Sequence, residues 1–179
     1  MTVIVSDTLQ RHNIALFSNV SLEDAFLLSL KNGKYWLNEN WAALDLLPRK
    51  KISRWNEWLY HSDSPETYQR ICEIVLNDEY INSLVEEKVK LFSKRKSQNL
   101  NETFWQAMFK GARNYILEEL AIFAIMLRGE RAIDVYPGTW FKELFLALSK
   151  YSQEELMEGF PNAADIKVDF VKNKLPVIF

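Results

Sequence analysis

The sequence predicts an α/β domain in which long helices flank a mostly parallel sheet. Residues 2–6 are rich in β-branched side chains, as a strand is, and similar short runs recur later in the chain. Long stretches with apolar residues at helical spacing separate these runs, and strands joined through helices pair in parallel. With 179 residues, of which 48% are hydrophobic, the chain has enough apolar material for one core. We therefore expect a single domain over residues 1–179.

The first third of the chain is expected to continue from this strand into helical segments. Ser21 is a typical N-cap, and the apolar residues after it repeat at helical spacing. The Asn-Gly pair at residues 32–33 is expected to break or bend this helix, and Pro48 ends the stretch that follows. Residues 50–60 are expected to form a further helix with a basic first turn.

The remainder of the chain is expected to be mainly helical, with short strands toward its end. A turn at residues 62–65 starts a helical pattern that extends to residue 96, with a break between two helices near residue 77. The elements expected after it are a helix over 99–127, a strand over 131–136, a helix over 139–150 and strands over 167–171 and 175–179. Because ligands bind outside the carboxyl ends of strands in such sheets, we expect a site where the first strand and the strand over 131–136 end.

Composition excludes several classes of protein. The net charge is −2, and the single cysteine, Cys72, excludes an internal disulfide and fits a reducing compartment, so we expect a cytoplasmic protein. No apolar run reaches the roughly 18 residues of a membrane span, and no basic segment indicates a secretory signal. The two histidines, His12 and His61, are too far apart for a metal site, and the sequence has no glycine-rich phosphate loop. We expect neither a metal nor a cofactor.

The most informative side chains are Tyr115 and Glu119, one helical turn apart. At this spacing the phenol and the carboxylate lie over one another on one face, beside the apolar Ile122 and Phe123. A carboxylate in such surroundings finds a hydrogen-bond partner or has its pKa raised, and a raised carboxylate next to a phenol suits general acid–base catalysis. The alternative is a Tyr-Glu pair hydrogen-bonded to solvent. Glu118 points about 100° away around the helix and is expected to tolerate replacement.

A basic cluster precedes two tryptophans in the helix expected over residues 50–60. Its members are Arg49, Lys50, Lys51 and Arg54. The simplest interpretation is a solvated face. Alternatively, Trp55 and Trp58 anchor the helix to the core and leave the cations outward as a stripe, which would attract a phosphate backbone whatever the net charge. A second basic run lies over residues 88–96.

Four segments of the sequence occur in an informative order and spacing. They are Val3–Asn13, Gly33–Leu37, Arg49–Trp58, and a Tyr-x-x-x-Glu helix whose following strand ends in Tyr136-Pro137-Gly138. Over about residues 3–150 this arrangement resembles the tRNA-dependent cyclodipeptide synthases, and Tyr-Pro after the strand resembles one subfamily of them. The resemblance implies a Rossmann-like, mostly parallel sheet with flanking helices, similar to the catalytic core of tyrosyl- and tryptophanyl-tRNA synthetases.

The resemblance also implies an activity and a set of site residues. Members of the family join aminoacyl groups from two aminoacyl-tRNAs into a cyclodipeptide, or diketopiperazine, in secondary metabolite biosynthesis. By position, Tyr115 and Glu119 would hold and deprotonate the substrate amine, and Tyr136 would support the later proton transfers. Ile122 and Asp134 would line the aminoacyl pocket. The tRNA-binding residues would be Arg49, Lys50, Lys51 and Arg54. The resemblance implies no metal and no cofactor, because the tRNA ester already holds the free energy, and it implies a monomer.

One feature of the family is expected to be missing. The family's nucleophilic serine lies in a Gly- and Ser-rich strand and turn that precede the segment matched by Val3–Asn13, so we expect a domain that is incomplete at its N-terminus. Ser6 is a substitute at a strand end, although no histidine or lysine base lies near it in sequence. A sheet edge left exposed would favour self-association. The alternatives to an active synthase are a non-catalytic tRNA-binding relative and a protein-interaction module of the same fold.

Overall fold

A computed structural model describes residues 2–47, 49–96, 102–129, 132–136 and 141–167, with the side chains of residues 2, 93–96, 102–103, 129, 132–136 and 163–167 left outside this description. The strands are β1 (Thr2–Val5), β2 (Lys51–Arg54), β3 (Ala132–Tyr136) and β4 (Ala163–Lys167). The helices are α1 (Arg11–Ser18), α2 (Leu22–Asp45), α3 (Trp55–Leu59), α4 (Ser64–Asn77), α5 (Glu79–Lys96), α6 (Glu102–Gly129) and α7 (Lys142–Leu148). Short 3₁₀ turns are η1 (Thr8–Gln10), η2 (Ser149–Tyr151), η3 (Glu155–Met157) and η4 (Phe160–Asn162).

The described strands form two parallel pairs, as the sequence predicts. β1 pairs with β2, with Val3 opposite Ile52, and β3 pairs with β4, with Asp134 opposite Asp165. The helices α1 and α2 connect the first pair and α7 connects the second. Helix-joined parallel strands are the α/β arrangement expected from the sequence. Helices nevertheless account for most of the described chain, and the sheet component is small.

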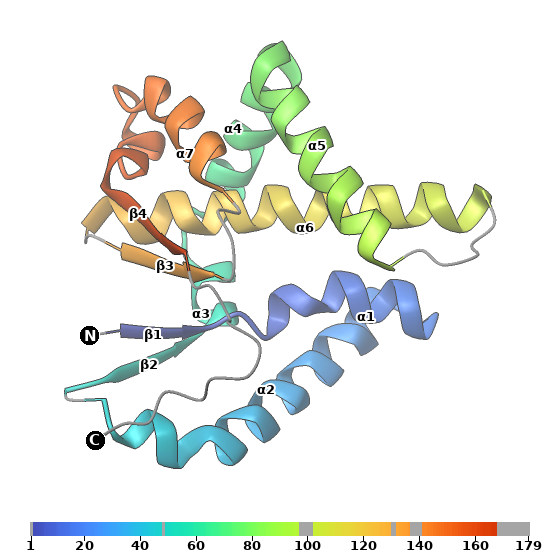
Figure 1. Ribbon diagram of the computed structural model, residues 1–179, viewed down its shortest axis with the longest axis vertical. Coiled ribbons are helices and arrows are strands. Elements are labelled where there is room, and N and C mark those ends of the chain that lie inside the picture. Colours follow the sequence, from blue (N-terminus) through green and yellow to red (C-terminus); the bar gives the residue numbers. More distant parts are fainter. Residues whose placement is uncertain (1, 48, 97–101, 130–131, 137–140, 168–179) are drawn as a thin grey trace.

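The long helix α6 organises the core. Figure 1 shows it crossing the middle of the molecule, with α4, α5 and α7 on one side and α1 and α2 on the other. Its residues Ile116, Leu120 and Ala124 recur every four positions and are almost fully buried, in a cluster shared with α4, α5 and α7. Ile122, on another face, packs with Leu9 and belongs to a second cluster near β1. A helix that buries two faces is held by tertiary packing rather than by its own propensity.

The helices of the second half match their predicted positions. The helical pattern up to residue 96 is two helices, α4 and α5, that meet at Asp78. The predicted helix over 99–127 is α6, and the strand predicted over 131–136 is β3. The helix predicted over 139–150 corresponds to α7, which ends at Leu148 and is followed by the 3₁₀ turn η2. β4 begins four residues before the strand expected at 167–171, and residues 168–179 lie outside the described residues.

The predicted break at Asn32-Gly33 is wrong, since α2 continues through both residues. Gly33 is required inside the helix because α2 closely approaches the end of β1. A Cβ atom added to Gly33 would lie 2.2 Å from Oδ2 of Asp7. Glycine in a helix costs about 1 kcal/mol relative to alanine, but only glycine leaves room for the buried carboxylate at this point.

The predicted helix over residues 50–60 is also wrong in its first half. Lys51–Arg54 is the strand β2, whose Ser53 is buried, and only Trp55–Leu59 is helical. Pairing with β1 decides this, because each residue of β2 has a partner in that strand. The carboxylate of Glu57 accepts a hydrogen bond from the backbone N–H of Arg54 at 3.0 Å and starts α3 there. The helix α1, whose bounds the sequence did not predict, begins before Ser21, the predicted helix start.

Replacing Gly33 with alanine should destabilise the fold. The new methyl group would displace Asp7 and the end of β1, and such overpacking costs about 1–3 kcal/mol in the free energy of unfolding. Chemical denaturation followed by circular dichroism measures the change.

Gly111→Ala is the matched control, because Gly111 also lies inside a helix but its added Cβ would meet its nearest atom, on Leu16, at 3.8 Å. This change should stabilise the protein by about 0.5–1 kcal/mol. Equal effects of the two substitutions would contradict the role assigned to the contact between Gly33 and Asp7.

Candidate functional site

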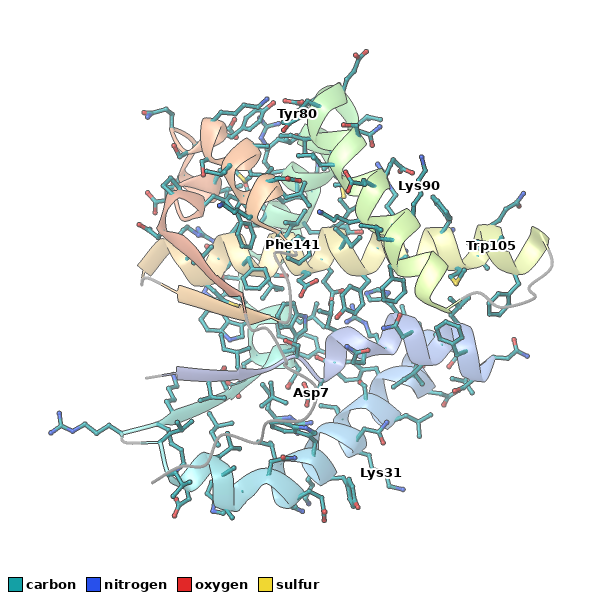
Figure 2. The ribbon with its side chains drawn as sticks, viewed as in Figure 1. Asp7, Lys31, Tyr80, Lys90, Trp105 and Phe141 are labelled. Carbon is teal, nitrogen blue, oxygen red and sulfur yellow. The ribbon has the colours of Figure 1, made fainter. Side chains whose placement is uncertain are left out.

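A cleft of about 530 Å³ opens at the carboxyl end of β1. It lies where β1 passes into η1 and α1 on one side and faces α2 on the other, and Figure 2 places Asp7 at this junction. Its lining residues are Ile4, Val5, Ser6, Asp7, Gln10, Ile14, Ser29, Asn32, Gly33 and Trp36. The end of β1 is one of the two strand ends where the sequence predicts a site.

An ion pair between Asp7 and Arg54 lies at the end of β1, next to the cleft. Asp7 is buried, and its Oδ1 accepts a hydrogen bond from the backbone N–H of Thr8 at 2.8 Å. Its Oδ2 accepts from Nε of Arg54 at 2.6 Å, and a second guanidinium nitrogen donates to the carbonyl oxygen of Leu30 at 2.7 Å. Arg54 therefore ties β2 to the end of β1 and to α2. Its charge serves an internal contact, unlike the outward stripe that the sequence predicted.

The rest of the basic cluster lies between α2 and β2 and at the first residue of β2. Arg49 is exposed and has a left-handed backbone conformation, with φ of 48°. Lys50 donates to Asp45 at 2.8 Å and places its ammonium group 5.5 Å from the ring centre of Trp41. Lys51 is exposed at the start of β2. Three of the four predicted tRNA-binding residues are therefore consecutive, two between α2 and β2 and the third at the start of β2, and none of them lies in a helix.

In the second basic run, Lys90 is exposed, whereas Lys88 is buried with Glu143 at 4.0 Å. Residues 93–96 belong to α5, but their side chains are outside the description.

Tyr115 reaches the cleft through Gln10. Its phenolic oxygen accepts a hydrogen bond from Nε2 of Gln10 at 3.2 Å, and Gln10 lines the cleft. The ring stacks on Phe92 with centroids 6.0 Å apart, and the edge of the His12 ring approaches it at 6.5 Å. Tyr115 and Glu119 both lie on α6 at the predicted spacing, and Oε2 of Glu119 is buried. The geometry thus places the phenol of the predicted pair beside the cleft.

Glu118 has a structural role that the sequence analysis missed. It is 6% exposed, and its carboxylate accepts hydrogen bonds from two guanidinium nitrogens of Arg11, from Nε1 of Trp55 at 3.1 Å and from His12, whose Nε2 lies 3.1 Å away. Burial raises the pKa of Glu118, but the hydrogen bonds from His12 and Arg11 outweigh it and hold this pKa below the ordinary value of 4.5. The expectation that Glu118 would tolerate replacement is therefore wrong. The signal was present in the sequence, because Glu118 begins an otherwise apolar helical stripe with positions 121, 122 and 125.

The other predicted site residues are placed less directly. Ile122 is fully buried in the cluster that contains Leu9 and Trp55, and it is not among the residues that line the cleft. Tyr136 is the last residue of β3, and Asp134 lies two positions before it. The side chains of both fall outside the description, as does Pro137, so their predicted place at a shared pocket stays a prediction.

Both Ser6 and Ser29 line the cleft, and Ser6 is the candidate nucleophile, because the Ser29 hydroxyl donates to the carbonyl oxygen of Phe26 at 2.6 Å. The thiol of Cys72, in α4, is the alternative, but burial raises its pKa and keeps it protonated at neutral pH. Within the described ranges no group of three or more His, Cys, Asp or Glu side chains could hold a metal ion. No helix of the described part of the chain is both long and apolar enough to span a membrane.

Comparison with known proteins tests the family resemblance. No family model matches the sequence, and no curated protein matches it. Among solved structures, a CDPS from Fluoribacter dumoffii superposes with a TM-score of 0.76 and 20% identity, over 92% of this chain and 73% of that chain. A cyclodipeptide synthase from Candidatus Glomeribacter gigasporarum bound to Phe-tRNAPhe superposes with a TM-score of 0.73 and 20% identity, over 99% of this chain and 71% of that chain. The chain has the cyclodipeptide synthase fold. The Rossmann-like architecture implied by the sequence resemblance is thereby confirmed.

In this cyclodipeptide synthase fold, Glu118→Gln should destabilise the protein by about 3–5 kcal/mol, because the amide leaves the buried guanidinium of Arg11 without its counter-charge. The effect should depend on pH. Since the pKa of Glu118 is lowered by folding, its ionised form stabilises the protein above pH 4.5, and this contribution is lost as the pH falls through the lower folded value.

Urea denaturation of both proteins between pH 3 and pH 7 measures the difference in unfolding free energy, which should be large at pH 7 and shrink in acid. Glu158→Gln is the control, since Glu158 is exposed and its replacement should change stability by less than about 0.5 kcal/mol. A difference that does not vary with pH would contradict the assigned charge state of Glu118.

Proposed function

We propose that this chain transfers aminoacyl groups from two aminoacyl-tRNAs and closes them into a cyclodipeptide. The observation that carries the proposal is the cleft at the end of β1. Ser6 and Gln10 both line it, and Gln10 is hydrogen-bonded to Tyr115. The fold supports it, because a solved protein of this fold is bound to Phe-tRNAPhe. A serine hydroxyl together with a phenol and a carboxylate suits acyl transfer between esters, and here the phenol and the carboxylate lie on α6.

The proposed reaction has three acyl transfers. The Ser6 hydroxyl attacks the carbonyl carbon of the first aminoacyl ester, and its proton leaves with the terminal ribose hydroxyl of the tRNA. The amine of the bound aminoacyl group then attacks the second aminoacyl ester and releases the second tRNA. The free amine of the resulting dipeptide attacks the Ser6 ester, which closes the ring and restores the Ser6 hydroxyl. Each step exchanges an ester for an ester or an amide, so neither a metal nor a cofactor enters this scheme.

The residues of α6 and β3 take the roles implied by the family resemblance. We assign Glu119 to deprotonation of the substrate amine and Tyr115 to holding the aminoacyl group. Tyr136 supports the proton transfers of ring closure, and Ile122 and Asp134 shape the aminoacyl pocket. Charged tRNAs are found in the cytoplasm, which is where we place the reaction.

The identity of the acyl acceptor differs from the sequence-based expectation. That expectation assigns the ester to a serine in a segment preceding Val3. The cleft supports Ser6 instead, because Ser6 follows the last residue of β1 and lines the space in which Gln10 contacts Tyr115. The missing histidine or lysine base is not an obstacle in this scheme, since the proton of Ser6 passes to the leaving ribose oxygen.

Ser6→Ala should abolish the covalent aminoacyl-enzyme and the cyclodipeptide. After incubation with aminoacyl-tRNAs, mass spectrometry of the intact chain and of its peptides should find an adduct of one aminoacyl residue on Ser6. Ser29→Ala is the matched control, because Ser29 lines the same cleft but donates its hydroxyl to the carbonyl oxygen of Phe26 at 2.6 Å.

An adduct that survives Ser6→Ala would place the nucleophile elsewhere. Binding of charged tRNA with neither adduct nor product would favour the alternative function, a non-catalytic tRNA-binding relative.

Glu119→Gln should lower the rate of cyclodipeptide formation by on the order of a hundredfold or more, because an amide cannot accept the proton of the amine. The affinity for tRNA should not change. The measurement compares the rate of product formation with the dissociation constant for tRNA. Glu87→Gln, on the exposed face of α5, is the control. A parallel loss of tRNA affinity would contradict the assignment of Glu119 as a base.

The segment Arg49-Lys50-Lys51, which leads into β2, is proposed to bind the phosphates of tRNA. Replacing all three with alanine should weaken binding about equally for different tRNAs and flatten the dependence of affinity on salt. Filter binding at several salt concentrations measures both effects. Arg54 is left unchanged, because its contact with Asp7 would confound the result. Unchanged binding would move the tRNA surface to another part of the chain, such as residues 88–96.

A further inference from the structure

The amide of Gln10 is oriented by two hydrogen bonds at the edge of the cleft. Its Oε1 accepts from Nδ2 of Asn13 at 2.8 Å, and its Nε2 donates to the phenolic oxygen of Tyr115 at 3.2 Å. Gln10 is exposed and lines the cleft, so its contacts are not required to satisfy a buried group. The two ends of this amide therefore bind different elements, Asn13 on α1 and the phenol of Tyr115 on α6.

The position of this amide is fixed by the residues next to it. Arg11 and His12 follow Gln10 directly, and both bind Glu118, which lies three residues after Tyr115 on α6. Arg11 also donates to the carbonyl oxygen of Thr8 at 2.9 Å, which holds η1 against the start of α1. The first turn of α1 is therefore clamped to one turn of α6. Gln10 meets Tyr115 at the end of this clamp that faces the cleft.

We propose that Gln10 is a positioning residue that sets the direction of the Tyr115 hydroxyl hydrogen, an inference that rests on the proposed function. A phenol both donates and accepts hydrogen bonds. When its oxygen accepts from the Gln10 amide, its hydrogen points away from Gln10. The same amide stabilises negative charge on the phenolic oxygen. Tyr115 then donates to an oxygen of the aminoacyl ester, and accepting the proton of the amine is left to Glu119.

The opposite arrangement gives the opposite roles. If the amides of Gln10 and Asn13 both turned over, Oε1 of Gln10 would accept from the phenol. The hydrogen of Tyr115 would then point at Gln10 and away from the substrate. The two arrangements differ in sign, because a donor to the phenolic oxygen favours the phenolate and an acceptor from the hydroxyl favours the neutral phenol.

The substitution Gln10→Met distinguishes the two arrangements of the amide. Methionine has nearly the same shape as glutamine but no hydrogen-bond donor and no acceptor of comparable strength. The probe is 3-fluorotyrosine placed at position 115 of the full chain, and its ¹⁹F resonance is followed during a pH titration. We expect the midpoint of this titration to move upward by about half to one pH unit in Gln10→Met. Gln106→Met is the control. Gln106 is exposed and lies on α6, as Tyr115 does, and its replacement should not change the titration midpoint of Tyr115.

A downward shift, or no shift, in a variant whose circular dichroism is unchanged would overturn the proposal. The titration needs neither tRNA nor catalysis, so its failure is distinct from failure of the proposed function. If the chain is active, Gln10→Met should also lower kcat for cyclodipeptide formation with little change in KM for aminoacyl-tRNA. An upward shift without any product from the parent protein would leave the role of Gln10 toward Tyr115 intact and would refute the synthase activity.

Discussion

The described structure depends on how the buried carboxylate of Glu118 is neutralised. A buried charge costs several kcal/mol unless its oxygens are satisfied, and removing one partner of a buried pair exposes that cost. The donors come from Arg11, which is 107 residues away in sequence, and from Trp55, which is 63 residues away. These donors bring α1 and α3 onto α6. The interaction therefore specifies which elements meet, and the apolar clusters around it supply the packing.

A second charged contact lies at the cleft itself, because Asp7 is one of the lining residues. Asp7 binds Arg54 from β2 and approaches α2 so closely that only Gly33 fits there. The Glu118 contacts hold the start of α1 against α6, and the Asp7 contact holds the end of β1 against β2 and α2. Ser6 precedes Asp7 in sequence and lines the cleft. Preorganisation of this kind suits a reaction in which positioning contributes most of the rate.

Several expectations failed where long-range contacts decided the outcome. Residues 51–54 look like the basic start of a helix that carries Trp55 and Trp58, and only the pairing with β1 makes them a strand. Arg54 resembles its basic neighbours in sequence, but its charge is directed inward by Asp7. Glu118 and Glu119 are adjacent and chemically identical, and one helical step of about 100° assigns the first to a buried network.

The sequence by itself determined the features that depend on local periodicity. Apolar spacing and capping predicted α4, α5 and α6, and the spacing of four put Tyr115 and Glu119 on one helix. The alternation of strands and helices predicted parallel pairing. Only the tertiary structure decided that Glu118 is the buried anchor and that Ser6 lines the cleft. The physical reason is that periodicity records which face of an element is buried, whereas the partner of a buried charge comes from segments distant in sequence.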